Sequence, residues 1–271
     1  MSRPVVLKLG GELLEDAAAT HAIARVIAAI ARQKPLVVVH GGGREIDAAL
    51  AQAGIQKRQV DGIRVTDEAT LGVVVSVLAG TINTRFAAAI SAAGGQAVGL
   101  TGADAGVGLV TAAPPMVSAA GETVSLGRVG QPVSDGVPHL LHHLIAGRYI
   151  PVIASIGADA SGALFNVNAD TIAGALAERL WASRLVIAGT TPGVLDASGR
   201  TIPDLTGDAE RALVASGVAN AGMIAKLQAC RRALQAGVGS VLIGNGRDAA
   251  RLETMAVTGE SADGGFTRVI P

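Results

Sequence analysis

Short runs of branched aliphatic residues alternate with alanine-rich segments along nearly all of the 271 residues. The aliphatic runs suit strands that are buried on both faces, and the alanine-rich segments have apolar residues at helical spacing. Strands are expected near residues 5–9, 36–40, 96–100, 149–153, 185–188 and 241–243, helices near 20–32, 45–53, 68–93, 170–180 and 223–236, and a hairpin excursion over 107–129. This alternation predicts an α/β fold with an open, mostly parallel sheet.

The first expected strand ends in residues that favour phosphate binding. It reads Val5-Val6-Leu7-Lys8-Leu9 and is followed by Gly10 and Gly11. Glycines at a strand end let backbone N–H groups approach an anion, because no Cβ stands in the way, and Lys8 adds a positive charge. The second strand ends similarly in Gly41-Gly42-Gly43, where a helix follows. Two such turns favour a polyphosphate ligand, although the alternative is that the glycines only form tight turns.

Lysine is rare in this chain. None of the four lysines, Lys8, Lys34, Lys57 and Lys226, follows a glycine, which excludes a Walker A loop. The remaining 18 of the 22 basic residues are arginines. Where arginine is the usual cation, a lysine in a glycine-rich context is favoured for its compact charge, and this directs attention to Lys8 and Lys226.

Composition narrows the function to a small-molecule enzyme or a ligand sensor. The formal net charge is zero and aromatic residues make up 2%, which disfavours nucleic-acid binding. Hydrophobic residues make up 49%, yet no apolar run is expected to reach membrane-spanning length, and the first strand begins too early for a signal peptide. The single cysteine, Cys230, excludes an internal disulfide and fits a reducing compartment. We expect a cytoplasmic protein without nucleic-acid or membrane partners.

Polar residues occur where a ligand site would need them. Arg64 stands between apolar residues of a short strand or hairpin arm, where its guanidinium could pair with a carboxylate; the alternative is a surface arginine. Asn166, Asn168 and Asp170 precede an alanine-rich helix. Asn168 or Asp170 could simply be the N-cap, although three polar residues exceed what a cap requires.

Two further patterns carry less weight. His139, His142 and His143 are close in sequence, but their surroundings are those of an amphipathic helix more than of a zinc site. Residues 244–249 match the G-x-G-x-x-A fingerprint of dinucleotide-binding folds, but too little sequence follows for the partner strands. A nicotinamide-binding protein is therefore a remote alternative.

Taken in order, these stretches resemble the amino acid kinase family along nearly the whole chain. The matching stretches are Lys8-Leu9-Gly10-Gly11, His40-Gly41-Gly42-Gly43, Gly62-Ile63-Arg64-Val65-Thr66, Asn166-Val167-Asn168-Ala169-Asp170, Pro192-Gly193-Val194-Leu195 and Met223-Ile224-Ala225-Lys226. Within the family, the resemblance points to members that phosphorylate N-acetyl-L-glutamate. It implies a sheet sandwiched between helices, with an N-terminal lobe (1–180) for the acyl-amino acid and dimerisation, and a C-terminal lobe (181–271) for ATP.

The resemblance also implies roles for individual residues. Lys8 and Lys226 would stabilise the transferring phosphoryl group, and Asp170 would hold both lysines in place. The substrate would be bound by Gly42, Gly43, Arg64 and Asn166, with Arg64 on its α-carboxylate. The nucleotide would contact Gly10, Gly11, Thr190, Thr191, Pro192, Gly193, Val194, Leu195, Val218, Ala219 and Asn220. Mg²⁺ would be carried by the ATP phosphates, without a metal site of the protein's own.

The chain departs from the family pattern in two places. Relatives usually carry an aspartate after the nucleotide-side strand, where this chain has Gly189-Thr190-Thr191-Pro192-Gly193. The missing carboxylate puts the nucleotide contacts in question. After Gly43, relatives often read Pro-Gln-Ile, whereas this chain reads Arg44-Glu45-Ile46 and so adds a cation beside the substrate-side turn.

The implied reaction is phosphoryl transfer from ATP to the side-chain carboxylate of N-acetyl-L-glutamate, in arginine biosynthesis. That carboxylate is ionised at neutral pH, so no general base is needed. A kinase for another acyl amino acid or an aminoadipate derivative, and a catalytically silent ligand sensor of this fold, remain alternatives. Arginine-inhibited relatives carry an extra N-terminal helix, for which residues 1–4 leave no room. We therefore expect an arginine-insensitive homodimer that associates through the apolar segment 68–93.

Overall fold

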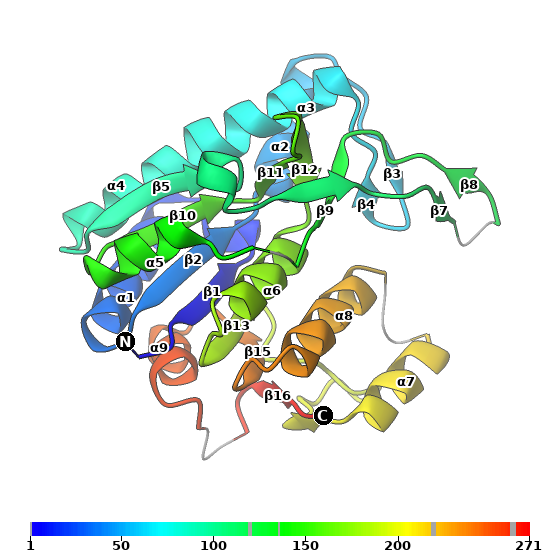
Figure 1. Cartoon of the computed structure of the whole chain (residues 1–271). Helices are drawn as coiled ribbons and strands as arrows, with labels where there is room; N and C mark the ends of the chain where they lie inside the picture. Colours follow the sequence, from blue (N-terminus) through cyan, green and yellow to red (C-terminus); the bar gives the residue numbers. More distant parts are fainter. Residues whose placement is uncertain (1, 119–120, 135, 218–220, 261–263) are drawn as a thin grey trace.

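The computed structural model describes residues 2–118, 121–134, 136–217, 221–260 and 264–271, and it is built on an eight-stranded sheet (Figure 1). The strand order is β14-β16-β15-β13-β1-β2-β10-β5. These strands are β1 (Val5–Leu9), β2 (Leu36–His40), β5 (Ala97–Thr101), β10 (Ile150–Ala154), β13 (Arg184–Gly189), β14 (Asp204–Leu205), β15 (Val241–Asn245) and β16 (Thr267–Val269). Neighbouring strands are parallel except for β15 and β16. The predicted open, mostly parallel sheet is confirmed.

Helices cover both faces of this sheet. Successive strand residues point to opposite faces, so Leu7 and Leu9 pack in one hydrophobic core and Val6 packs in the other. The first core is completed by α1 (Ala17–Gln33), α4 (Thr84–Ala92) and α9 (Ala249–Val257), and the second by α5 (His139–Ala146), α6 (Ala169–Arg179) and α8 (Ala221–Gln235). The sheet is therefore sandwiched between two helical layers, as the family resemblance implies.

Smaller elements extend the carboxyl edge of the sheet. A four-stranded sheet combines β6 (Val110–Ala112), β9 (Val129–Pro132), β11 (Ile156–Ala158) and β12 (Leu164–Val167). Two short hairpins, β3 (Gln59–Val60) with β4 (Ile63–Arg64) and β7 (Met116–Val117) with β8 (Thr123–Val124), lie beyond β9 (Figure 1). The expected hairpin excursion over 107–129 is therefore confirmed. The remaining helices named below are η1 (Gly11–Leu13), α2 (Gly43–Gln52) and α7 (Gly207–Ala215).

The helix expected over 68–93 is continuous but changes its winding midway. α3 (Glu68–Val75) passes into a π-helical segment, η2 (Ser76–Asn83), and then into α4. In the described part of the chain, Glu68–Ala92 is the single helix long and apolar enough to cross a membrane, so the expectation of no such run is wrong. However, 44% of the most apolar 18-residue stretch of this helix is buried in the molecule, and Leu78, Ile82 and Phe86 lie in the core. The run is a core helix.

Two helices begin earlier than expected. α2 begins at Gly43 rather than at Glu45, so the third glycine is already part of its first turn. α8 begins at Ala221 rather than at Met223, which places Lys226 in the second helical turn and not in the first. Helix boundaries are less well defined by apolar spacing than the helices themselves.

A fully buried histidine ends β2. The Nδ1 atom of His40 lies 3.1 Å from the Gly41 carbonyl, and its Nε2 lies 3.1 Å from the Asn83 amide nitrogen. Because that amide is a donor, Nε2 accepts and Nδ1 carries the proton in a neutral ring. Burial lowers the pKa of His40 from 6.5 to about 4; the Gly41 carbonyl raises it and the charge of Arg85 lowers it.

Replacing His40 with glutamine should make the free energy of unfolding depend less on pH under acidic conditions. The unfolded chain gains a proton on His40 below pH 6.5, whereas the folded chain resists it until about pH 4. Stability is therefore lost as pH falls through this window, by about 3 kcal/mol for this residue, and the residue contributes no pH dependence above it. Urea unfolding of the wild type and His40→Gln between pH 4 and 6.5 measures the slope. Equal slopes would contradict this assignment.

Candidate active site

The carboxyl ends of β1 and β2 meet in two glycine turns. A Cβ atom on Gly11 would lie 2.6 Å from the Cα of Gly42, so the two backbones approach as closely as glycine allows. Gly43 has open space beside it, and no side chain caps the N-terminus of α2. The first N–H groups of α2 are therefore available to an anion. Ligands of parallel α/β sheets bind at this edge.

A buried ion pair joins β1 to α6 on one side of these turns. The Lys8 ammonium lies 2.8 Å from Oδ1 of Asp170, and the two side chains are 11% and 9% exposed. The contact is close but poorly aligned for a hydrogen bond, so the attraction is chiefly that of two opposite charges. The pair places an ammonium group at the end of the central strand.

Asn168 caps α6 and leaves the Asp170 carboxylate available to the lysines. Its Oδ1 accepts hydrogen bonds from the backbone N–H groups of Asp170 and Thr171, at 2.9 and 3.1 Å. Of the two capping residues considered from the sequence, Asn168 is the cap. Asp170 is in the first helical turn and has a different task.

Lys226 acts electrostatically on the same carboxylate. It is carried by α8, which packs against α6. Burial raises the pKa of Asp170, but the charges of Lys8 and Lys226 oppose it, and the pKa falls below its ordinary value. Asp170 is therefore ionised at neutral pH. A carboxylate in this state suits the orientation of cations rather than proton transfer.

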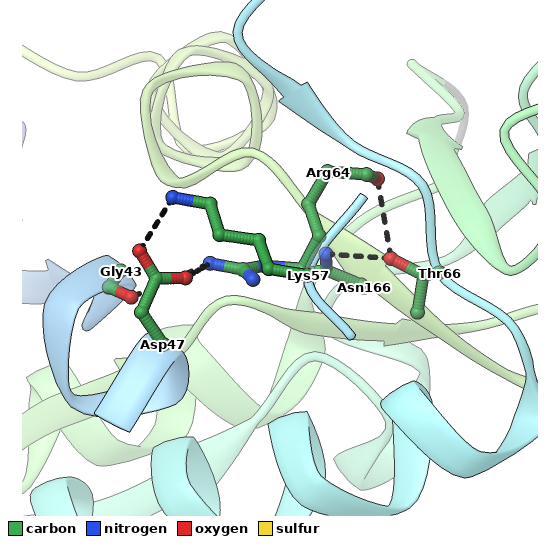
Figure 2. Close-up of polar contacts among 6 residues, drawn as sticks. All are labelled: Gly43, Asp47, Lys57, Arg64, Thr66 and Asn166. Atoms are coloured by element: carbon green, nitrogen blue, oxygen red, sulfur yellow. Dashed lines mark hydrogen bonds and ion pairs between the residues drawn. The ribbon is translucent and has the colours of Figure 1, made fainter. Parts of the chain in front are cut away.

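Arg64 lies beside the second glycine turn, at the start of α2 (Figure 2). Its Nη2 is 2.5 Å from Oδ1 of Asp47 and donates a longer bond, of 3.3 Å, to the Gly43 carbonyl. The other Asp47 oxygen lies 2.7 Å from the Lys57 ammonium. The Arg64 side chain is 9% exposed, and its buried Nη1 has no acceptor among the described residues. Such a donor is unfavourable unless a ligand provides the acceptor.

Asn166 is linked to the backbone of Arg64 through Thr66 (Figure 2). Its Nδ2 donates to Oγ1 of Thr66 at 3.1 Å, and the Thr66 hydroxyl donates to the Arg64 carbonyl at 3.3 Å. These bonds connect β12 to the strand that carries Arg64. The structure thus brings Gly43, Arg64 and Asn166 together from three separate segments.

Asp47 and Lys57 belong to this cluster as well, although neither was expected from the sequence. Asp47 lies one helical turn after Gly43, so a helix that starts at the glycines places its carboxylate near the same end. An acidic residue at that spacing, with an arginine expected nearby, was the available signal. Burial raises the pKa of Asp47, but hydrogen bonds from Lys57 and Arg64 outweigh burial and lower it. Asp47 therefore stays charged and fixes one side of the guanidinium.

The turn after β13 has an exposed half and a buried half. Thr190, Thr191 and Pro192 are exposed at the carboxyl end of the strand. Gly193 and Val194 are buried, the Val194 N–H donates to Oγ1 of Thr267 at 2.8 Å, and the Val194 side chain belongs to the second core. The Val194 side chain therefore has a packing role, and a contact between Val194 and a nucleotide stays a prediction. Leu195 is half-buried.

The other nucleotide candidates, Val218, Ala219 and Asn220, lie outside the described residues. Within the described ranges, no three His, Cys, Asp or Glu side chains converge in a way that could hold a metal ion. That statement covers His139, His142 and His143 of α5.

Several known proteins are similar to this chain. The model of the amino acid kinase family matches residues 3–245. An acetylglutamate kinase of Dinoroseobacter shibae is 42% identical over 245 residues, which cover 90% of this chain and 82% of the relative. One of Caulobacter vibrioides is 42% identical over 257 residues, which cover 90% of this chain and 83% of the relative.

Solved structures share the fold. N-acetylglutamate synthase from Neisseria gonorrhoeae, complexed with coenzyme A and N-acetyl-glutamate, superposes with a TM-score of 0.80 at 24% identity, over 99% of this chain and 59% of that one. Carbamate kinase from Giardia lamblia bound to AMP-PNP gives a TM-score of 0.70 at 18% identity, over 99% and 98%. With its family match over 3–245, this chain belongs to the amino acid kinase family.

Proposed function

We propose that this chain transfers the γ-phosphoryl group of ATP to the side-chain carboxylate of N-acetyl-L-glutamate, the acetylglutamate kinase reaction of arginine biosynthesis. The observation that carries the proposal is a pair of cationic centres, one beside each of the two glycine turns. One is the Lys8 ammonium, and the other is the buried, unpartnered Nη1 of Arg64. A dicarboxylate fits such an arrangement, with one carboxylate on Arg64 and the other at the glycine turns. The 42% identity to acetylglutamate kinases supports the choice of acid.

In this proposal the protein positions and neutralises charge but moves no proton. The attacking carboxylate is ionised at neutral pH, so a general base has nothing to remove. Charge spreads over the phosphoryl oxygens during transfer, and Lys8 and Lys226 are the cations that meet it. Asp170 holds the ammonium groups in place. The backbone N–H groups near Gly11, Gly42 and Gly43 donate hydrogen bonds to the remaining phosphoryl oxygens.

The order of strands supports the proposed division into two lobes at residue 180. β5, β10, β2 and β1, from 1–180, form one half of the sheet, and β13, β15, β16 and β14, from 181–271, form the other. We assign the acid to the first half and the nucleotide to the second. Gly10, Gly11 and the exposed Thr190, Thr191 and Pro192 then meet where β1 pairs with β13. Mg²⁺ would be held by the ATP phosphates with few protein ligands.

We further propose that the chain forms a homodimer in the cytoplasm. β5 is an edge strand of the central sheet, and an unpaired edge favours pairing with a second copy. Beside it, exposed residues at four-residue spacing on the long helix are small and uncharged: Gly72, Ser76, Gly80, Thr84 and Ala88. A face of this kind lets helices approach closely across a twofold axis. The buried free thiol of Cys230 is compatible with a reducing compartment.

Hydroxylamine trapping of acyl phosphates across a panel of acids, with ATP and Mg²⁺, tests the proposed function. Product with N-acetyl-L-glutamate is expected. Product only with another acyl amino acid or an aminoadipate derivative would replace the substrate and keep the kinase. No product with any acid would contradict the proposal and favour a ligand sensor.

Lys8→Ala and Lys226→Ala should each lower kcat by roughly a hundredfold or more, as the loss of one transition-state donor typically does. Lys34→Ala is the matched control, because Lys34 is exposed and lies at the amino end of β2, whereas the site lies at the carboxyl ends of the strands. Thermal unfolding checks that each variant is folded. Near-normal turnover in either variant would remove that lysine from the site.

Arg64→Ala should raise KM for the acid by about tenfold or more, since hydrogen bonds to charged groups contribute roughly 1.5–3 kcal/mol. Asp47→Asn should raise KM by less, because Arg64 remains but loses the carboxylate that orients it. Both should affect KM more than kcat, as expected for a clamp that binds substrate and transition state alike. Asp208→Asn on α7 is a control for removing an exposed ion pair. A fall in kcat at constant KM would contradict the clamp role.

Light scattering should give the mass of a dimer, and Thr84→Glu should shift it toward the monomer, because two copies of the new charge would face each other at the axis. Ala212→Glu, on an exposed position of α7, should leave the dimer intact. A hexamer, or a monomeric wild type, would contradict the proposed assembly. Insensitivity of the activity to millimolar arginine remains a prediction, to be measured in the same preparations.

A further inference from the structure

The carboxylate of Glu12 lies over the glycines that end β1 and β13. A Cβ atom on Gly10 would lie 2.2 Å from Oε1 of Glu12, and a Cβ atom on Gly189 would lie 3.4 Å from the same oxygen. Gly10 is two residues after Lys8 in extended backbone, so both point to the same face of the sheet. Glu12 therefore lies on the face that carries Lys8, at the junction of the two halves of the sheet.

This carboxylate has no partner of its own. Glu12 is half-buried, and its oxygens have no hydrogen bond or ion pair with any described residue. By contrast, the neighbouring Glu15 pairs with Arg44 and the buried Asp170 pairs with Lys8. A carboxylate at this edge of the sheet that has no protein donor is available as a ligand for a hard cation.

The charges around the glycine turns indicate what kind of cation. Lys8 and Lys226 carry two positive charges, and Asp170 and Glu12 carry two negative ones, so these four side chains sum to zero. A polyphosphate without metal would meet no net positive charge from them and would be repelled by Glu12. A divalent cation between Glu12 and the phosphate oxygens converts that repulsion into attraction. Magnesium takes this set of ligands readily, with one carboxylate, phosphate oxygens and water.

We infer that Glu12 is a protein ligand of the divalent cation that enters with the nucleotide, and that it makes nucleotide binding depend on that cation. The inference rests on the proposed ATP site. The alternative is that Glu12 has a purely structural role, as an acidic residue in the first turn of η1. In that case, removing the Glu12 charge would not change how strongly nucleotide binding depends on the metal.

Calorimetric titration of AMP-PNP into the wild type and Glu12→Gln, with Mg²⁺ and with EDTA, separates these roles. The wild type should bind the magnesium complex at least about tenfold more tightly than the metal-free nucleotide, as loss of one charge-assisted contact implies. In Glu12→Gln the ratio of these two affinities should shrink several-fold. The metal-free nucleotide should bind to Glu12→Gln more tightly than to the wild type. Glu15→Gln removes the same charge three residues away and should keep the wild-type ratio.

Manganese provides a readout that does not depend on nucleotide heat. Electron paramagnetic resonance of free Mn²⁺ in the presence of AMP-PNP should show weaker metal retention by Glu12→Gln than by the wild type. Glu12→Asp keeps the charge on a shorter side chain and should retain part of the metal dependence, which covers the case that the glutamine variant does not fold. An unchanged ratio of affinities in a folded Glu12→Gln, with nucleotide still bound, overturns this inference alone. A wild type that binds nucleotide in neither buffer overturns the proposed function as well.

Discussion

The buried ion pair between Lys8 and Asp170 is the interaction on which the rest of the site depends. Removing one partner of such a pair leaves an isolated charge in the interior, which is far less favourable than the pair itself. The fold supports both members: β1 is a central strand buried along its length, and Asn168 takes over the capping of α6. Lys226 joins from α8 through its effect on the pKa of Asp170. Three elements thus fix one cluster of charge at the middle of the sheet.

A second constraint is the close approach of the glycine turns. Gly11 and Gly42 leave no room for a side chain, so only backbone lies where the two turns meet. Lys8 and Asp170 lie beside the first turn, and Arg64 and Asp47 lie beside the second. Two anionic reactants repel each other, and bringing them together requires positive charge at both ends and N–H groups between them. The arrangement supplies both, and it supports the proposal of phosphoryl transfer to a carboxylate.

Much of the fold follows from the sequence because apolar spacing is a local property. β1 and β2 were expected at 5–9 and 36–40, where the structure has them. The π-helical winding of η2 was not predictable from spacing, since the apolar pattern does not distinguish i+4 from i+5 bonding. Asp47, Lys57 and Glu12 escaped notice because their importance comes from neighbours on other segments. Asp47 matters only once Arg64 is folded against α2, and Glu12 only once β13 lies beside β1.

The central claim is that Asp170 orients cations and transfers no proton. It is tested most directly by the pH dependence of kcat for the wild type and Asp170→Asn, with folding checked by circular dichroism. Asp170→Asn should be severely impaired at every pH, because a neutral amide cannot balance the charges of Lys8 and Lys226. Recovery of the full wild-type rate by Asp170→Asn at high pH would contradict it, since that result would assign Asp170 the role of a base.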